Sequence, residues 1–417
     1  MGMTVLIGLI TLAATNTITI DEALSGYADT TVWLVVAAFL IAGGVVNSGI
    51  GKRIALKLVS WFGKTILGLA YSICGAELIL GPVVPSNTAR GGGILAPIVN
   101  SLSNSLGSSS KKNPEKAGRF LTLVGAHANL ITAAMFLTGM AANPLVSKAV
   151  EDIYGISFGW GTWALGAIVP GIIALALLPI IIYQISKPTL TDTLSAQKKA
   201  SEELKEMGNK LNMKEWIMLS ILIILLILWS TKFIHGIGTT LVAWIGVGIM
   251  LITNTQKWSD IISNSKAWDT LIWLGGLLTM ANMLKTHGFI DWMVIYVQGW
   301  VAGYNGLMIV ILLGLIYFYS MYMFSMLTAH IFAMAAVFLS LTFSAGGQPL
   351  LVAGVFAYFS CLCGCLTNYS TGPVIIYFGL DYVKASKWFS TGFIISLFHI
   401  VIWLGIGLVW WKILGWW

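Results

Sequence analysis

The sequence predicts an all-α membrane protein that crosses the bilayer many times. Of its 417 residues, 57% are hydrophobic and only 9% are charged, and the mean hydropathy is +0.87. Soluble domains carry about a quarter charged residues. The apolar runs here are roughly 15–20 residues long, unlike the short alternating strands of a membrane barrel. The composition excludes a cytoplasmic enzyme, a nucleic-acid-binding protein and a secreted disulfide scaffold.

The apolar runs form two halves, which we assign to residues 1–186 and 215–417. The hydrophilic segment between them, 187–214, holds six Lys against four acids. It fits an amphipathic surface helix and a plain solvated linker equally well. The predicted spans lie in or near these ranges: 3–20, 32–46, 66–84, 120–146, 158–183, 215–234, 238–254, 270–284, 306–326, 328–343, 349–366 and 390–411.

The basic residues predict the orientation of the chain. Segments 102–119 and 187–214 are both basic and are separated by two spans, so they lie on one side of the membrane. The positive-inside rule makes that side cytoplasmic. We expect the membrane to be a plasma (inner) membrane. This rule explains the net charge of +7 better than a nucleic-acid partner does.

The cysteines do not suggest a cofactor. Cys74, Cys361, Cys363 and Cys365 all lie in apolar stretches, and no neighbouring His completes a zinc pattern. A free cysteine packs like a small hydrophobic residue. We therefore expect core residues, with no metal centre and no cofactor.

An internal repeat has an offset of 240 residues. Trp33-Leu34 recurs as Trp273-Leu274, and Thr88-Ala89-Arg90 recurs as Thr328-Ala329-His330. Together with the orientation, this offset predicts two repeats of inverted topology, the usual plan of secondary transporters. In such proteins, interrupted helices in both halves bind the substrate near the middle of the membrane. The candidate interruptions are hairpin tips at 85–91 and 325–330 and broken helices at 138–145 and 366–373.

Arg90 and His330 occupy the same repeat position. A cation in an apolar stretch is costly and persists where it meets an anion or lines a wet cavity. We expect Arg90 to bind a carboxylate or phosphate beside the donors of Ser86, Asn87 and Thr88. The alternative is that Arg90 pairs with Glu77 and only holds the hairpin. His330 would add a second charge or, if neutral, a hydrogen-bond donor.

Two further titratable residues lie in these stretches. Glu77 is a candidate proton carrier. His127 lies among small residues, and we interpret it as a packing residue.

Four motifs, in order, resemble the divalent anion/sodium symporter family, the INDY-type dicarboxylate transporters, and most closely its exchanger branch. They are the Ser-Asn-Thr signature at 86–88, AMFLTGMAANPL at 134–145, FSMLTAH at 324–330 and LTNYSTGP at 366–373. The resemblance implies a homodimer with a scaffold domain and a transport domain that moves like an elevator. It also implies that the two hairpin tips hold the substrate's carboxylates.

The resemblance also bears on sodium. Ser86 and Asn87 match positions that help to form a cation site in sodium-coupled members, whereas Met326 and Leu327 replace the polar ligands expected in the second half. Sodium is therefore not favoured. The candidate substrate-binding residues are Ser86, Asn87, Thr88, Arg90, Asn143, Ser325, Thr328, His330, Ser370 and Thr371.

The sequence thus predicts a non-enzymatic carrier that exchanges malate, succinate, fumarate or 2-oxoglutarate. Arg90 and His330 would act as built-in cations, and a carrier with uncompensated charge crosses unfavourably when empty. One alternative is a sodium-coupled di- or tricarboxylate symporter. A membrane enzyme or an anion channel is the second alternative, although no nucleophile–base motif is present.

Overall fold

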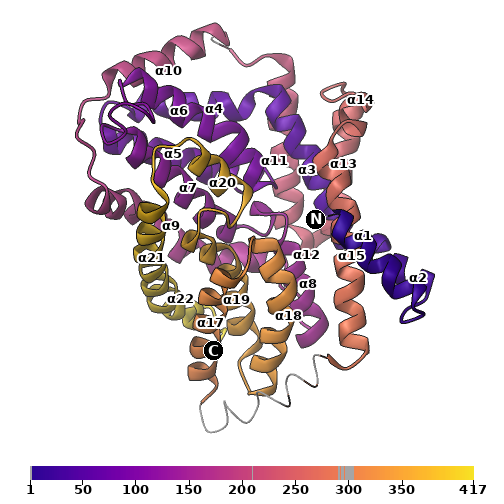
Figure 1. Ribbon diagram of the computed structural model, residues 1–417. Coiled ribbons are helices and arrows are strands. Elements are labelled where there is room, and N and C mark those ends of the chain that lie inside the picture. The colour runs from indigo at the N-terminus through magenta and orange to yellow at the C-terminus, as the bar shows by residue number, and fades with distance from the viewer. Residues whose placement is uncertain (1, 209, 290–291, 293–294, 296–304) are drawn as a thin grey trace.

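The computed structural model describes residues 2–208, 210–289, 292, 295 and 305–417, and these residues form helices without a strand (Figure 1). Seven of the described helical segments are long and apolar enough to cross a membrane. The predicted class, an all-α multi-pass membrane protein, is confirmed.

The helices of the first half and of the connecting segment are α1 Gly2–Ala14, α2 Ile20–Ser25, η1 Gly26–Ala28, α3 Thr30–Ser48, α4 Ile50–Phe62, α5 Ile66–Leu80, η2 Thr88–Leu95, α6 Ala96–Ser105, α7 Gly118–Met135, η3 Leu137–Gly139, α8 Asn143–Tyr154, α9 Trp160–Ile185 and α10 Leu194–Glu206.

Those of the second half are α11 Met213–Ser230, α12 Lys232–His235, α13 Thr239–Ile252, α14 Trp258–Ile262, α15 Ser265–Thr286, α17 Gly306–Ser320, η4 Met321–Met323, α18 Leu327–Ser344, α19 Pro349–Leu362, η5 Cys363–Leu366, α20 Gly372–Gly379, α21 Ala385–Ile400, η6 Val401–Ile406 and α22 Gly407–Ile413.

Helices α7 and α19 form the interior of the bundle and contact each other. Almost every residue of both is buried, including polar residues that would be costly to place against lipid. Each leads into a helix break, at residues 136–142 after α7 and at 367–371 after η5. Proline in the first turn of α8 and of α20 suits the restart, because that position has no intrahelical acceptor for an N–H group. The two breaks therefore lie deep in the protein.

The turn between α5 and η2 differs from the expectation for the first hairpin tip. We expected a Gly-rich tip at residues 85–91, but the non-helical stretch is 81–86 and the helix resumes at Asn87. Gly91 and Gly92 lie in this helix, and side chains from other parts of the protein occupy the space that a Cβ atom would need. A Cβ at Gly91 would lie 2.6 Å from the Asn129 amide, and one at Gly92 would lie 2.3 Å from Ile376. The wide π-helical turn η2 accommodates this crowding.

Helix α5 is too short to span a bilayer. Its 15 residues reach about 22 Å, whereas the hydrocarbon core is about 30 Å thick. A helix that turns back at this depth has the geometry of a re-entrant hairpin. Helix α17 has the same length and lies 240 residues later. This equal spacing supports a duplicated architecture.

The connecting segment contains helix α10, the first of the two alternatives that its composition left open. Helix α10 packs on α4 and α6 (Figure 1). Ala196 and Ala200 of α10 are fully buried. Glu203 pairs with Lys52 of α4 at 2.8 Å and accepts a hydrogen bond from Ser101 of α6 at 3.3 Å. The segment therefore lies along the first half as a surface helix.

Candidate functional site

The first turn, the non-helical stretch 81–86 before η2, leads into residues that contact the second helix break. Ser86 caps the resuming helix, since its Oγ accepts a hydrogen bond from the Ala89 N–H at 3.2 Å. The Asn87 amide donates to Thr371 Oγ1 at 3.1 Å. A Cβ at Gly372 would lie 2.4 Å from Thr88 Oγ1, so the two segments are in close contact. Two of the predicted binding residues, Asn87 and Thr88, thus meet Thr371 and Gly372, where the break at 367–371 ends.

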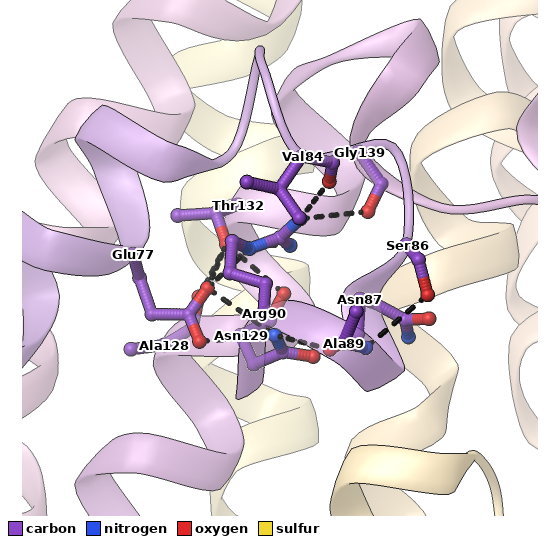
Figure 2. Close-up of polar contacts among 10 residues, drawn as sticks. All are labelled: Glu77, Val84, Ser86, Asn87, Ala89, Arg90, Ala128, Asn129, Thr132 and Gly139. Carbon is purple, nitrogen blue, oxygen red and sulfur yellow. Dashed lines mark hydrogen bonds and ion pairs between the residues drawn. The ribbon is translucent and has the colours of Figure 1, made fainter. Parts of the chain in front are cut away.

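Arg90 is fully buried and bonded on all sides (Figure 2). Its Nε donates to Glu77 Oε2 at 2.6 Å, and its Nη2 donates to Thr132 Oγ1 at 3.2 Å. Its Nη1 donates to two backbone carbonyls, Val84 at 3.0 Å and Gly139 at 3.1 Å. These carbonyls belong to the first turn and to the first helix break. The guanidinium therefore satisfies backbone groups that the interrupted helices leave without partners.

This geometry corrects the expectation that Arg90 is an uncompensated cation, while its contact with an anionic ligand stays a prediction. The Glu77 carboxylate balances its charge, and the guanidinium points at protein acceptors. The structure shows the alternative named from the sequence, in which Arg90 pairs with Glu77 and holds the hairpin. Glu77 is correspondingly an ion-pair partner in this conformation, with both oxygens engaged by protein donors.

Two residues of α7 complete this network and were not singled out from the sequence. The Asn129 amide donates to Glu77 at 3.0 Å and to the Asn87 carbonyl at 3.2 Å, and the Thr132 hydroxyl donates to Glu77 at 3.0 Å. Their spacing of three residues, which puts both on one face of α7, was the available signal. His127, interpreted as a packing residue, is buried against Trp388 with ring centroids 6.4 Å apart.

Asn143 closes the first helix break instead of facing an open site. Its amide donates to the Ala133 carbonyl in the last turn of α7 at 2.8 Å, and to the Phe136 carbonyl, which also accepts the Gly139 N–H, at 3.0 Å. Cys361, one of the cysteines expected in the core, is buried and its thiol contacts Asn143 Oδ1 at 3.1 Å. Asn143 is therefore a structural cap in this conformation.

His330 makes the second-half counterpart of the Arg90 contacts. It is buried, and its Nε2 lies 2.8 Å from Ser320 Oγ and 3.1 Å from the Tyr317 carbonyl. Tyr317 lies 240 residues after Glu77, the same offset that relates His330 to Arg90. Both residues therefore reach back to the same position of the preceding helix. His330, too, is directed into the protein interior.

The second helix break also contacts the second turn, which is the short stretch 324–326 between η4 and α18. Ser325 is exposed and Thr328 half-buried, and helix α18 starts between them at Leu327. The Leu327 N–H donates to the Ser370 carbonyl at 2.7 Å. Ser370 Oγ in turn donates to the Gly364 carbonyl at 2.6 Å. The first turn bonds to Thr371 and the second to the adjacent Ser370, so the two turns meet on neighbouring residues.

We call this meeting point the convergence site, and define it by Asn87, Thr88, Leu327, Ser370 and Thr371. Three helices, η2 with α6, α18 and α20, begin at or beside it. Helix N-termini carry free N–H groups and a partial positive charge, which favour anions. Hydroxyl and amide donors complete the set. Interrupted helices that meet inside a bundle of membrane spans are the arrangement in which secondary transporters bind their substrates.

The comparisons with known proteins identify the family. The family model described as sodium:sulfate symporter transmembrane region matches residues 1–417, and the chain belongs to this family. The resemblance found in the motifs is thereby confirmed.

The curated relatives cover the whole chain. It is 42% identical to the putative malate transporter YflS of Bacillus subtilis, over 100% of this chain and 87% of that protein. It is 38% identical to dicarboxylate transporter 1, chloroplastic, of Arabidopsis thaliana, over 100% of this chain and 75% of that protein.

Two solved transporter structures share the fold. The YdaH transporter of Alcanivorax borkumensis superposes with a TM-score of 0.64 at 13% identity, over 97% of this chain and 89% of that one. MtrF of Neisseria gonorrhoeae gives 0.62 at 13% identity, over 97% and 84%.

The buried ion pair generates a prediction about stability. Glu77→Gln leaves the Arg90 charge without its partner, and breaking a buried pair in this way costs about 3–5 kcal/mol. The double variant Glu77→Gln with Arg90→Met should recover part of that loss. Thermal unfolding of the purified protein in detergent measures both changes.

Lys148→Met is the matched control, because it breaks an exposed pair with Asp152 and should cost at most about 0.5 kcal/mol. A Glu77→Gln protein as stable as this control would contradict the role given to the ion pair.

Proposed function

We propose that this chain is a dicarboxylate transporter that exchanges C4 and C5 dicarboxylates, such as malate, succinate, fumarate and 2-oxoglutarate. The names of the two curated relatives support the substrate class. The observation that carries the proposal is the convergence site, where helix N-termini and neutral donors of both halves meet. Each carboxylate of the substrate would accept hydrogen bonds from one turn and from the shared break at 367–371.

Arg90 supports transport that needs no sodium ion. A sodium ion near the first turn would be coordinated by oxygen atoms, and the guanidinium already donates to the Val84 and Gly139 carbonyls of that turn and of the first break. The guanidinium thus joins the first turn and the first break, as a bound sodium ion would otherwise do. It does so as half of an ion pair, so it adds no net charge to the site.

Exchange follows from the charge that the substrate brings. Without substrate, the partial positive charges of the helix N-termini at the convergence site would cross the membrane without a counter-charge, which is unfavourable in a medium of low dielectric constant. The loaded carrier avoids this cost. We therefore propose antiport by an elevator movement of the turns and breaks against a scaffold, in a homodimer whose segments 102–119 and 187–214 face the cytoplasm of a plasma (inner) membrane.

A sodium-coupled symporter is the second candidate, favoured by the family's description as sodium:sulfate symporters. Ser86 and Asn87 would then belong to the cation site. The two candidates differ in whether uptake needs an internal substrate or an external sodium ion.

The first functional prediction concerns counterflow. Proteoliposomes loaded with unlabelled malate should accumulate labelled succinate at equal rates in sodium and choline buffer, because no cation has to bind. Empty vesicles should show little uptake. Sodium-dependent uptake into empty vesicles would contradict exchange.

The second functional prediction concerns Gly372. A methyl group there would overlap Thr88 Oγ1 at 2.4 Å and push the first turn away from the break. Overpacking of this kind costs about 1–3 kcal/mol, which corresponds to a roughly 5- to 150-fold loss of exchange rate for Gly372→Ala.

Gly379→Ala is the matched control, because it makes the same change at the other end of α20, where no atom lies within 4 Å. Malate–succinate exchange in proteoliposomes, at equal amounts of reconstituted protein, compares the two. Equal rates for both variants would show that the turn and the break do not have to meet.

A further inference from the structure

A cavity of about 400 Å³ lies between α4, α10 and the start of α11, apart from the convergence site. This volume falls in the roughly 300–1,000 Å³ range of small-ligand pockets. Most of its wall is aliphatic, and three helical segments contribute to it. We call it the α4–α10 groove, and its aliphatic lining residues are Ile50, Ile54, Leu204, Leu211 and Leu219.

Two cations line the groove. Lys57 is exposed, and among the described residues no carboxylate lies within ion-pair distance of it. Its Nζ lies 4.9 Å from the centre of the Trp61 ring. Arg53 is buried and donates to Glu215 at 2.7 Å and to the carbonyls of Gly208 and Met207. These three bonds leave two of the five guanidinium N–H groups for another acceptor.

Exposed aromatic residues place the groove at the level of the lipid headgroups. Trp61 and Phe62 end α4 with 57% and 58% of their surfaces exposed, and Trp216 on α11 is 55% exposed. Trp is enriched where the bilayer meets water. Trp216 lies one turn before Leu219, a lining residue of the groove. The groove thus combines a cationic wall with an aliphatic one at an interface.

We propose that the α4–α10 groove binds one anionic phospholipid of the leaflet that faces the basic segments. The headgroup phosphate meets Lys57 and the free N–H groups of Arg53, and the start of an acyl chain lies along the aliphatic wall. A soluble dicarboxylate would leave that wall in water. A zwitterionic lipid would bring a second cation to Lys57. The combination therefore selects a net negative lipid, whatever the transported substrate.

Native mass spectrometry of the full chain, with phosphatidylglycerol or phosphatidylcholine added to the detergent, tests this proposal. Wild-type protein should retain phosphatidylglycerol in preference to phosphatidylcholine. Lys57→Gln should weaken phosphatidylglycerol binding about five-fold, the loss expected for one lysine–lipid charge contact. Leu211→Trp keeps the charges but fills the groove, and it should remove the bound lipid. Unchanged melting temperatures would show that both variants fold.

Lys111→Gln is the matched control, because it removes the same charge from the basic loop 102–119 outside the groove. It should retain the lipid like wild type. An equal loss in Lys111→Gln and Lys57→Gln would mean diffuse attraction and would overturn the proposal. Equal retention of the two lipids, or full retention of phosphatidylglycerol by Leu211→Trp, would overturn it as well.

Discussion

The Arg90–Glu77 pair is the interaction on which the first half of the transporter depends. Both charges are completely buried, and removing two charges from water costs several kcal/mol per ion unless hydrogen bonds satisfy them. Here they do, because Thr132 and Asn129 supply neutral donors to the carboxylate. The guanidinium uses its remaining donors on carbonyls of the first turn and the first break. A non-helical backbone inside the membrane is thereby satisfied from within the protein.

The second half performs the same task without an ion pair. His330 occupies the position of Arg90 in the repeat, and Tyr317 that of Glu77. The imidazole bonds to the Ser320 hydroxyl and the Tyr317 carbonyl, and the tyrosine ring packs against it at 4.4 Å. Positions 240 residues apart thus carry different chemistry. The cation of the first half pairs with a carboxylate, whereas His330 in the second half contacts a hydroxyl group and a backbone carbonyl.

The sequence predicted most of the features that depend on hydropathy and on helix-breaking residues. Seven of the twelve predicted spans coincide with described helical segments that are long and apolar enough to cross a membrane. The other five, at 3–20, 66–84, 120–146, 238–254 and 270–284, do not, because an apolar run does not show how much of it is one apolar helix. The segments around Asn143-Pro144 and Gly372-Pro373 predicted where helices are interrupted. The direction in which a side chain points could not be predicted from the sequence. Arg90 and Asn143 were predicted to bind the substrate, but in the structure they point at backbone carbonyls, and only the packing of α5 and α7 decides this. The π-helical turn was also not predictable. Its glycines are typical of a loop in sequence, and only the structure shows that Asn129 and Ile376 pack against them.

The compensated Arg90 changes the explanation of how a dianion would be held. Three helices begin at or beside the convergence site, and each N-terminus contributes about half a positive charge, so together they provide roughly +1.5. The site thus offers a positive potential to an anion without any free cation. A site built from helix ends can therefore attract carboxylates with groups that cannot lose their charge by releasing a proton.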